Sequence, residues 1–124
     1  MSTSEIATVL AWHDALSTSD IDTLVSLSSA DIELGDSHGA AQGHAALRDW
    51  AERSDANIEV GDIYYRDGVV VVEERITSKG DPDDATVAAS AFRVVHDHVT
   101  SAFRHDDLAS ALAATELLDE DLQA

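Results

Sequence analysis

Apolar residues recur at helical spacing through the first fifty residues of this chain. They predict a helix over residues 4–17 with Ser4 as its N-cap, and a second over residues 21–27 capped by Asp20. A third helical pattern begins near residue 44 and runs to about residue 54. The N-terminal part of the chain is therefore expected to be mainly helical.

From about residue 57 the apolar positions recur at every second residue instead. This period predicts four strands, at residues 58–65, 69–77, 85–95 and 99–104. Earlier in the chain, a brief strand is expected at residues 32–34, followed by a loop rich in glycine and serine. The tail from residue 106 predicts a short helix. Residues 1–124 are expected to form a single α+β domain, with helices on one face of a curved antiparallel sheet.

The charge of the chain excludes some classes of partner. It has 25 acidic residues against 7 basic ones, and Lys79 is the only lysine. Such a surface repels phosphate backbones and anionic membranes, so no nucleic-acid or membrane partner is expected. It is also similar to the acidic surfaces of proteins from salt-loving organisms. With no cysteine and no long apolar run, the sequence predicts a soluble cytoplasmic protein without disulfides or thiolate metal sites.

Four segments in a fixed order resemble the nuclear transport factor 2-like superfamily, and especially its SnoaL-like cyclases and ketosteroid-isomerase-like members. They are SDIDTLVSLSSADIEL, GHAALRDW, FRVV and DDLASAL. The resemblance implies a cone-shaped, curved antiparallel sheet with three N-terminal helices packed on its concave face. It also implies a deep, mostly apolar pocket between sheet and helices, and commonly a homodimer formed through the open face of the sheet.

The residues that carry the family's best-known chemistry are replaced in this chain. By the resemblance, the isomerase general base falls on Leu34, the oxyanion-binding tyrosine on Trp12, and the acidic strand residue on Ser90. Leucine cannot accept a proton, and an indole donates one hydrogen bond without an acidic hydroxyl. Enolisation or aldol cyclisation by the familiar route is therefore not expected.

The same residue-by-residue comparison with the family, continued from Ser90 back through the hairpin, places Glu73 and Arg75 on the pocket side of their strand. It places Glu74 on the other side. Strand alternation requires that Glu73 and Arg75 share a face. There Arg75 could bind a carboxylate or enolate bidentately, while Glu73 could act as a base. The alternative is that the strand leaves the core at Glu73, so that these charges are solvated.

Two other candidates lie in the loop after the first short strand. Asp36 could replace the missing base if the loop bends inward, with His38 as its proton partner. A solvated Gly-Asp-Ser turn is the alternative reading. His96 and His98 have the spacing of a zinc-binding pair, but the motif falls at a hairpin turn and lacks a third ligand. No metal and no cofactor are expected.

The hypotheses for function share one pocket. Its expected lining is Trp12, Leu34, Trp50, Ser90 and Phe92, although aromatic residues at core spacing equally suit a filled core. The first hypothesis is a protein that binds a small apolar or carbonyl-bearing ligand. The second is an isomerase, cyclase or hydrolase with a non-standard acid-base residue, and the third is a structural dimerisation module.

Overall fold

A computed structural model describes residues 3–36, 39–53, 56–78 and 81–123 of the chain. The helices and strands, in chain order, are α1 (Thr3–Ser17), α2 (Ile21–Ser26), β1 (Ser28–Asp36), β2 (Gly39–Gln42), α3 (His44–Arg53), β3 (Ala56–Arg66), β4 (Val69–Ser78), β5 (Asp81–Val95), β6 (His98–His105), α4 (Leu108–Thr115), a 3₁₀ turn η1 (Asp119–Asp121) and β7 (Leu122–Gln123). In the described part of the chain the strands form one sheet, in the order β2-β1-β6-β5-β4-β3-β7. Neighbouring strands are antiparallel except β1 and β6, which are parallel.

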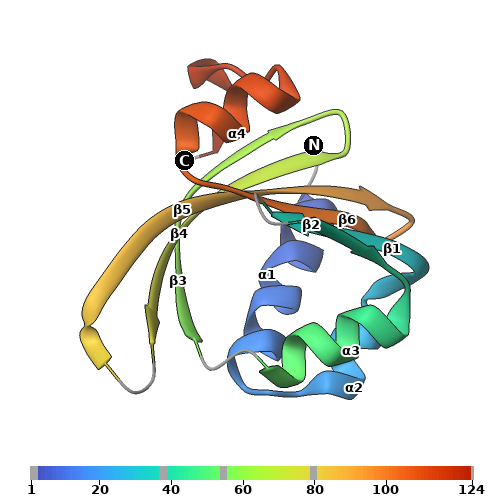
Figure 1. Cartoon of the computed structure of the whole chain (residues 1–124). Coiled ribbons are helices and arrows are strands. Elements are labelled where there is room, and N and C mark those ends of the chain that lie inside the picture. The colour runs from blue at the N-terminus through green and yellow to red at the C-terminus, as the bar shows by residue number, and fades with distance from the viewer. Residues whose placement is uncertain (1–2, 37–38, 54–55, 79–80, 124) are drawn as a thin grey trace.

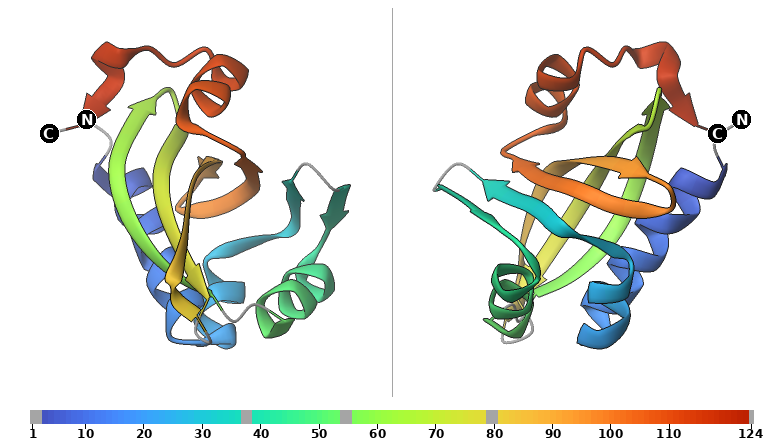
Figure 2. Two further views of the ribbon diagram at one scale, coloured as in Figure 1. Left: turned by 60° about the vertical axis from the view of Figure 1, so that its left-hand side comes forward. Right: turned by 90° about the vertical axis from the view of Figure 1, so that its right-hand side faces the viewer.

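The sheet is strongly curved, and its two faces carry different helices. Figure 1 shows α1, α2 and α3 on the concave side and α4 on the opposite side, and the rotated views agree (Figure 2). The predicted α+β fold, with three N-terminal helices against the concave face of a curved sheet, is confirmed. No helix in the described residues is long and apolar enough to cross a membrane.

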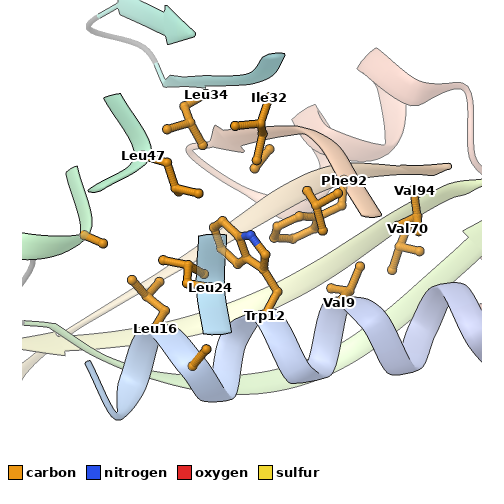
Figure 3. Packing of buried hydrophobic residues seen from close by; sticks show 14 of the residues in the cluster. Val9, Trp12, Leu16, Leu24, Ile32, Leu34, Leu47, Val70, Phe92 and Val94 are labelled. Atoms are coloured by element: carbon orange, nitrogen blue, oxygen red, sulfur yellow. The ribbon is translucent and has the colours of Figure 1, made fainter. Parts of the chain in front are cut away.

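The main hydrophobic core lies between the concave face and these three helices (Figure 3). Val70 and Val72 of β4 enter this core, whereas Val71 between them packs on the opposite face with Tyr64 and Ala111. Alternate residues of a strand point to opposite faces, so both faces of β4 are buried at this point. The run of four valines is the sequence signature of that double burial.

The ends of the elements show where the sequence pattern was informative. Asp20 caps α2 as predicted, because its side chain accepts a hydrogen bond from the backbone N–H of Thr23. Ser4 does not cap α1, since that helix already includes Thr3. At the β3–β4 hairpin, Asp67 and Gly68 both have positive φ angles, which is the backbone geometry that a tight two-residue turn requires.

Two strands were not predicted. β2 falls in the expected loop and pairs with β1, and its four residues are all exposed, so no alternation of apolar residues marks it. β7 is a two-residue strand that pairs with β3 at Ile63 and Tyr64. Neither element contributes a residue to the buried hydrophobic clusters, so neither leaves a hydrophobic pattern in the sequence.

Candidate functional site

A cavity of about 350 Å³ lies between the concave face of the sheet and helices α1 and α3. Its lining comprises Trp12, Leu34, Gly35, Asp36, Gly39, Ala40, Ala41, Ala46, Asp49, Trp50, Arg53, Glu74, Ser90, Phe92, Ala102 and Arg104. The five residues expected to line a pocket, namely Trp12, Leu34, Trp50, Ser90 and Phe92, are all among them. The structure therefore brings them together around one space, which we call the inner cavity.

Aromatic rings form one wall of the inner cavity. Trp12 stacks on Trp50 with their ring centroids 5.8 Å apart, and meets Phe92 edge to face at 5.3 Å. The indole N–H of Trp12 donates to the hydroxyl of Ser28 at 3.0 Å. That donor is therefore used within the protein, so Trp12 offers a ligand an apolar surface and no hydrogen bond.

A glutamate lies in the wall of this apolar space. Glu74 is only 1% exposed, and its carboxylate meets side chains from three other elements. Oε2 lies 2.6 Å from Nε2 of His13 on α1, and Oε1 accepts a 2.6 Å hydrogen bond from the hydroxyl of Ser90 on β5. Nε of Arg104 on β6 approaches Oε1 at 3.6 Å. We call these four residues the Glu74 cluster.

The sequence-based assignment of the two faces of β4 was wrong. Glu74 shares the inner face with Ser90, whereas Glu73 is half-buried on the outer face and Arg75 is exposed. The reason is an irregularity in the pairing of β4 with β5. Ser78 pairs with Asp81, but the next pair is Thr77 with Ala85, so the register shifts by an odd number of residues. Such a shift exchanges the faces that a regular ladder would give.

Burial would raise the pKa of the Glu74 carboxyl, but its polar neighbours prevail and hold that pKa below its ordinary value. The hydrogen bond and charge of His13 contribute most to this lowering, followed by the hydrogen bond from Ser90 and the charge of Arg104. Glu74 is therefore an ionised carboxylate at neutral pH. An ionised group in an apolar wall is a chemical feature that core packing does not require.

The other sequence candidates lie at the margin of the cavity or away from it. Asp36 is exposed at the end of β1, where it lines the inner cavity, and His38 lies outside the described residues. His96 and His98 are exposed at the β5–β6 turn. In the described part of the chain, no three histidine, aspartate or glutamate side chains are grouped so as to hold a metal ion.

Sequence reasoning missed the Glu74 cluster for a physical reason. His13 and its neighbour Trp12 on α1 are both buried, but His13 faces Glu74 on the sheet, whereas Trp12 lines the cavity. The sequence contains one weak indication. Val70, Val72 and Glu74 alternate along β4 and so lie on one face, which means that the charged Glu74 follows two buried valines on the inner side. That signal can be interpreted only once the face of the strand is known.

A second, larger hollow of about 790 Å³ lies between α4 and the outer face of β5 and β6. It is lined by Asp36, Val69, Ala91, Phe92, Arg93, Ser101, Phe103, Arg104, His105, Asp106, Ser110, Ala114, Thr115 and Glu116. Its acidic and basic side chains are exposed or half-buried, so water screens their charges. The inner cavity, with its buried carboxylate, is the better candidate site despite its smaller volume.

Comparison with known proteins agrees with this geometry. A family model for the SnoaL-like domain matches residues 9–107, which is most of the chain. The chain therefore belongs to the SnoaL-like domain family, within the nuclear transport factor 2-like fold. Among curated proteins, none matches the sequence significantly.

Solved structures show the same fold at low sequence identity. A nuclear transport factor 2-like protein from Cytophaga hutchinsonii has a TM-score of 0.75 at 15% identity, covering 86% of this chain and 92% of that one. An LEH-like epoxide hydrolase from M. tuberculosis has a TM-score of 0.70 at 18% identity, covering 90% and 84%. A protein with a ketosteroid isomerase-like fold from Catenulispora acidiphila, in complex with trimethylamine, has a TM-score of 0.67 at 26% identity, covering 91% and 95%.

Proposed function

We propose that this protein binds a small, mostly apolar molecule in the inner cavity. The observation that carries the proposal is Glu74, an ionised carboxylate in the wall of a space otherwise lined largely by aromatic and small apolar side chains. Replacing a buried charge network by apolar residues is often neutral or stabilising, so stability alone gives little reason to keep one. Perturbed carboxyls beside cavities are typical of functional sites.

The size of the cavity favours a compact ligand. A volume of about 350 Å³ is at the lower end of the range for small-molecule sites, about 300 to 1,000 Å³. The structurally similar M. tuberculosis protein is an epoxide hydrolase, and the C. acidiphila protein was solved with trimethylamine. Both similarities support a small organic molecule as the ligand.

Acid-base catalysis is the second candidate function, and the contact between Glu74 and His13 favours it. A carboxylate that lines a cavity and lies within hydrogen-bond distance of an imidazole behind it has the arrangement of a general acid or base. The reaction would belong to the isomerase, cyclase or hydrolase classes. In that case Glu74→Gln should retain ligand binding and lose turnover, whereas a pure binding protein would show no turnover in either form.

The outer face of the sheet supports a further part of the proposal, that the protein is a homodimer. Val87 and Val95 of β5 are 55% and 46% exposed on this face. A second copy that packs against this face would cover them. Light scattering should then give twice the mass of one chain, and a monomer at micromolar concentration would contradict the dimer.

Thermal unfolding against a panel of apolar acids, sterols and polyketide-like ketones, in low and high salt, tests the binding proposal. A ligand at 100 times its Kd should add about 2.7 kcal/mol of stability, which shifts Tm by several degrees in a domain of this size. The high-salt arm also tests whether the acidic surface requires salt, because salt screens its self-repulsion.

Two alanines of α3 provide a matched control. Ala46 lines the inner cavity, whereas its neighbour Ala45 is exposed. Ala46→Trp should fill the cavity and abolish the ligand-induced shift, while Ala45→Trp should retain it. If no compound shifts Tm, or if both variants respond equally, the inner cavity is not a binding site and a purely structural role is favoured.

A further inference from the structure

The hydrogen bonds of His13 determine where one of its protons lies. Nδ1 is 2.8 Å from the backbone carbonyl oxygen of Val9, one turn earlier in α1. A carbonyl oxygen can only accept a hydrogen bond, so Nδ1 carries a proton. In a neutral imidazole, Nε2 would then be a bare acceptor.

Nε2 instead faces an acceptor, Oε2 of Glu74, at 2.6 Å. Two lone pairs at that distance repel each other, so the contact contains a proton of its own. Whether this proton belongs to the imidazole or to the carboxyl, His13 and Glu74 together have zero net charge. The lowered pKa of Glu74 favours an imidazolium beside a carboxylate.

The two oxygens of the Glu74 carboxylate lie in different surroundings. Oε2 faces His13, which is not among the residues that line the inner cavity. Oε1 accepts the hydrogen bond of Ser90 and is approached by Arg104, and both of these residues line the cavity. Oε2 is therefore the rear oxygen of this carboxylate, and Oε1 is the oxygen on the cavity side.

Oε1 retains the capacity to accept another hydrogen bond. A carboxylate oxygen has two lone pairs, and the hydroxyl of Ser90 uses one of them. Nε of Arg104, at 3.6 Å, is too far away to donate to it. In the described part of the chain, Ser90 is thus the one side chain that donates to Oε1. A ligand that supplies a second donor would complete the hydrogen bonding of this oxygen.

The charges around the inner cavity balance. Besides Glu74, the lining contains two aspartates and two arginines, namely Asp36, Asp49, Arg53 and Arg104. The pair of His13 and Glu74 adds no net charge, because of its shared proton. Shape and hydrogen bonding therefore select the ligand, and an uncharged donor avoids the cost of moving a charge out of water.

We infer that His13 acts through Glu74: it holds a proton against Oε2 and leaves Oε1 as the acceptor for an uncharged O–H or N–H group of an apolar ligand. This inference rests on the proposed function and adds a positioning residue and the chemical class of the ligand. The apolar body of the ligand lies against Trp12, Trp50 and Phe92. Phe92 also meets the ring of His13 edge to face at 5.1 Å, which helps to fix the imidazole.

Nuclear magnetic resonance of the ¹⁵N-labelled protein tests the position of the proton without a ligand. At neutral pH both ring nitrogens of His13 should be protonated, or else the carboxyl of Glu74 should be. The ring N–H signals of His13 should be visible because its side chain is buried, whereas those of the exposed His98 should be lost by exchange with water. A bare Nε2 beside an ionised Glu74 would overturn the inference, whether or not any compound binds.

Two probes of similar shape test the donor. 2-Naphthol carries an O–H group, and 2-methoxynaphthalene has a methyl group in place of that hydrogen. Calorimetric titration should give a Kd for 2-naphthol that is lower by about tenfold or more, as expected for a hydrogen bond to a charged acceptor. If the ether binds equally well or better, the inference fails while the binding proposal stands. If neither binds, both fail.

Three variants test whether His13 is responsible for this preference. His13→Phe removes the proton from Oε2, so burial should raise the pKa of Glu74, and the preference for 2-naphthol should fall to within about twofold. His13→Gln places an amide N–H near the position of the ring Nε2 and should restore part of the preference. His98→Phe makes the same change at an exposed turn and should leave the preference unaltered. An undiminished preference in His13→Phe, or an equal loss in His98→Phe, would overturn the role of His13.

Discussion

Glu73 and Glu74 are identical neighbours in β4 that lie in opposite environments. Glu74 points into the concave side, is 1% exposed and meets His13, Ser90 and Arg104. Glu73 points to the outer side and is half-buried, with its side chain near Gly61 of β3. The face of the strand, and not the residue type, decides which carboxylate can take part in chemistry.

Removal of each carboxylate is the strongest test of this difference. Glu74→Ala should destabilise the protein by about 3 to 5 kcal/mol, because it leaves the buried His13 without its partner and the half-buried Arg104 without its counter-charge. Glu73→Ala should cost about 0.5 kcal/mol, as expected for a partly solvated side chain. Urea unfolding measures both, as a change in midpoint at constant slope.

Equal losses in the two variants would show that the environments of the two glutamates are energetically alike. A loss confined to Glu73→Ala would reverse the faces assigned to β4. Far-ultraviolet circular dichroism of Glu74→Ala should remain that of a folded α+β protein, so that the comparison refers to two folded proteins.

A smaller test uses two serines, one on each side of the sheet. The hydroxyl of Ser90 donates to an ionised carboxylate, and hydrogen bonds to charged groups contribute about 1.5 to 3 kcal/mol. Ser90→Ala should therefore lower the free energy of unfolding by about 1.5 kcal/mol. This is the low end of the range, since the same carboxylate oxygen of Glu74 still faces Arg104. Ser101 of β6 lines the outer hollow and is half-buried, so Ser101→Ala should change stability by less than about 0.5 kcal/mol. Urea unfolding of the two variants would contradict this contrast if it gave the same loss for both.

The sequence predicted the architecture well because burial leaves a periodic pattern. The helical stripe through Val9, Trp12 and Leu16 and the valine run of β4 both report which residues leave water. These patterns, with the order of the motifs, were sufficient to predict the curved sheet and five of the residues around the inner cavity, namely Trp12, Leu34, Trp50, Ser90 and Phe92. β2 and β7 bury no such stripe, and for that reason they were missed.

The chemistry of the site could not be predicted in the same way. Glu74 faces the cavity because of the odd register shift between Thr77 and Ser78. The alternation of apolar and polar residues along one strand does not show how that strand pairs with its neighbour. A regular ladder from the same hairpin would have placed Glu73 on the same face of the sheet as Ser90, which is the assignment that the sequence favoured. The position of a charge on a strand is thus less predictable than the strand itself, because one irregular pair reverses every face that follows.

The smallest expected difference between the two glutamates is in the acid limb of stability. The pKa of Glu74 is lowered in the folded protein, so its contribution is fully present above the ordinary glutamate pKa and is lost as pH falls through the lowered value. Below about pH 5 free histidines are already protonated, so the carboxyl is the group whose charge changes. Urea unfolding at a series of pH values from 6 downward should therefore show a smaller loss of stability in Glu74→Gln than in the unmodified protein. Glu73→Gln should follow the unmodified protein, because it leaves the buried carboxyl in place. If Glu74→Gln lost stability toward acid as steeply as Glu73→Gln, the Glu74 cluster would not hold its carboxylate in the ionised form.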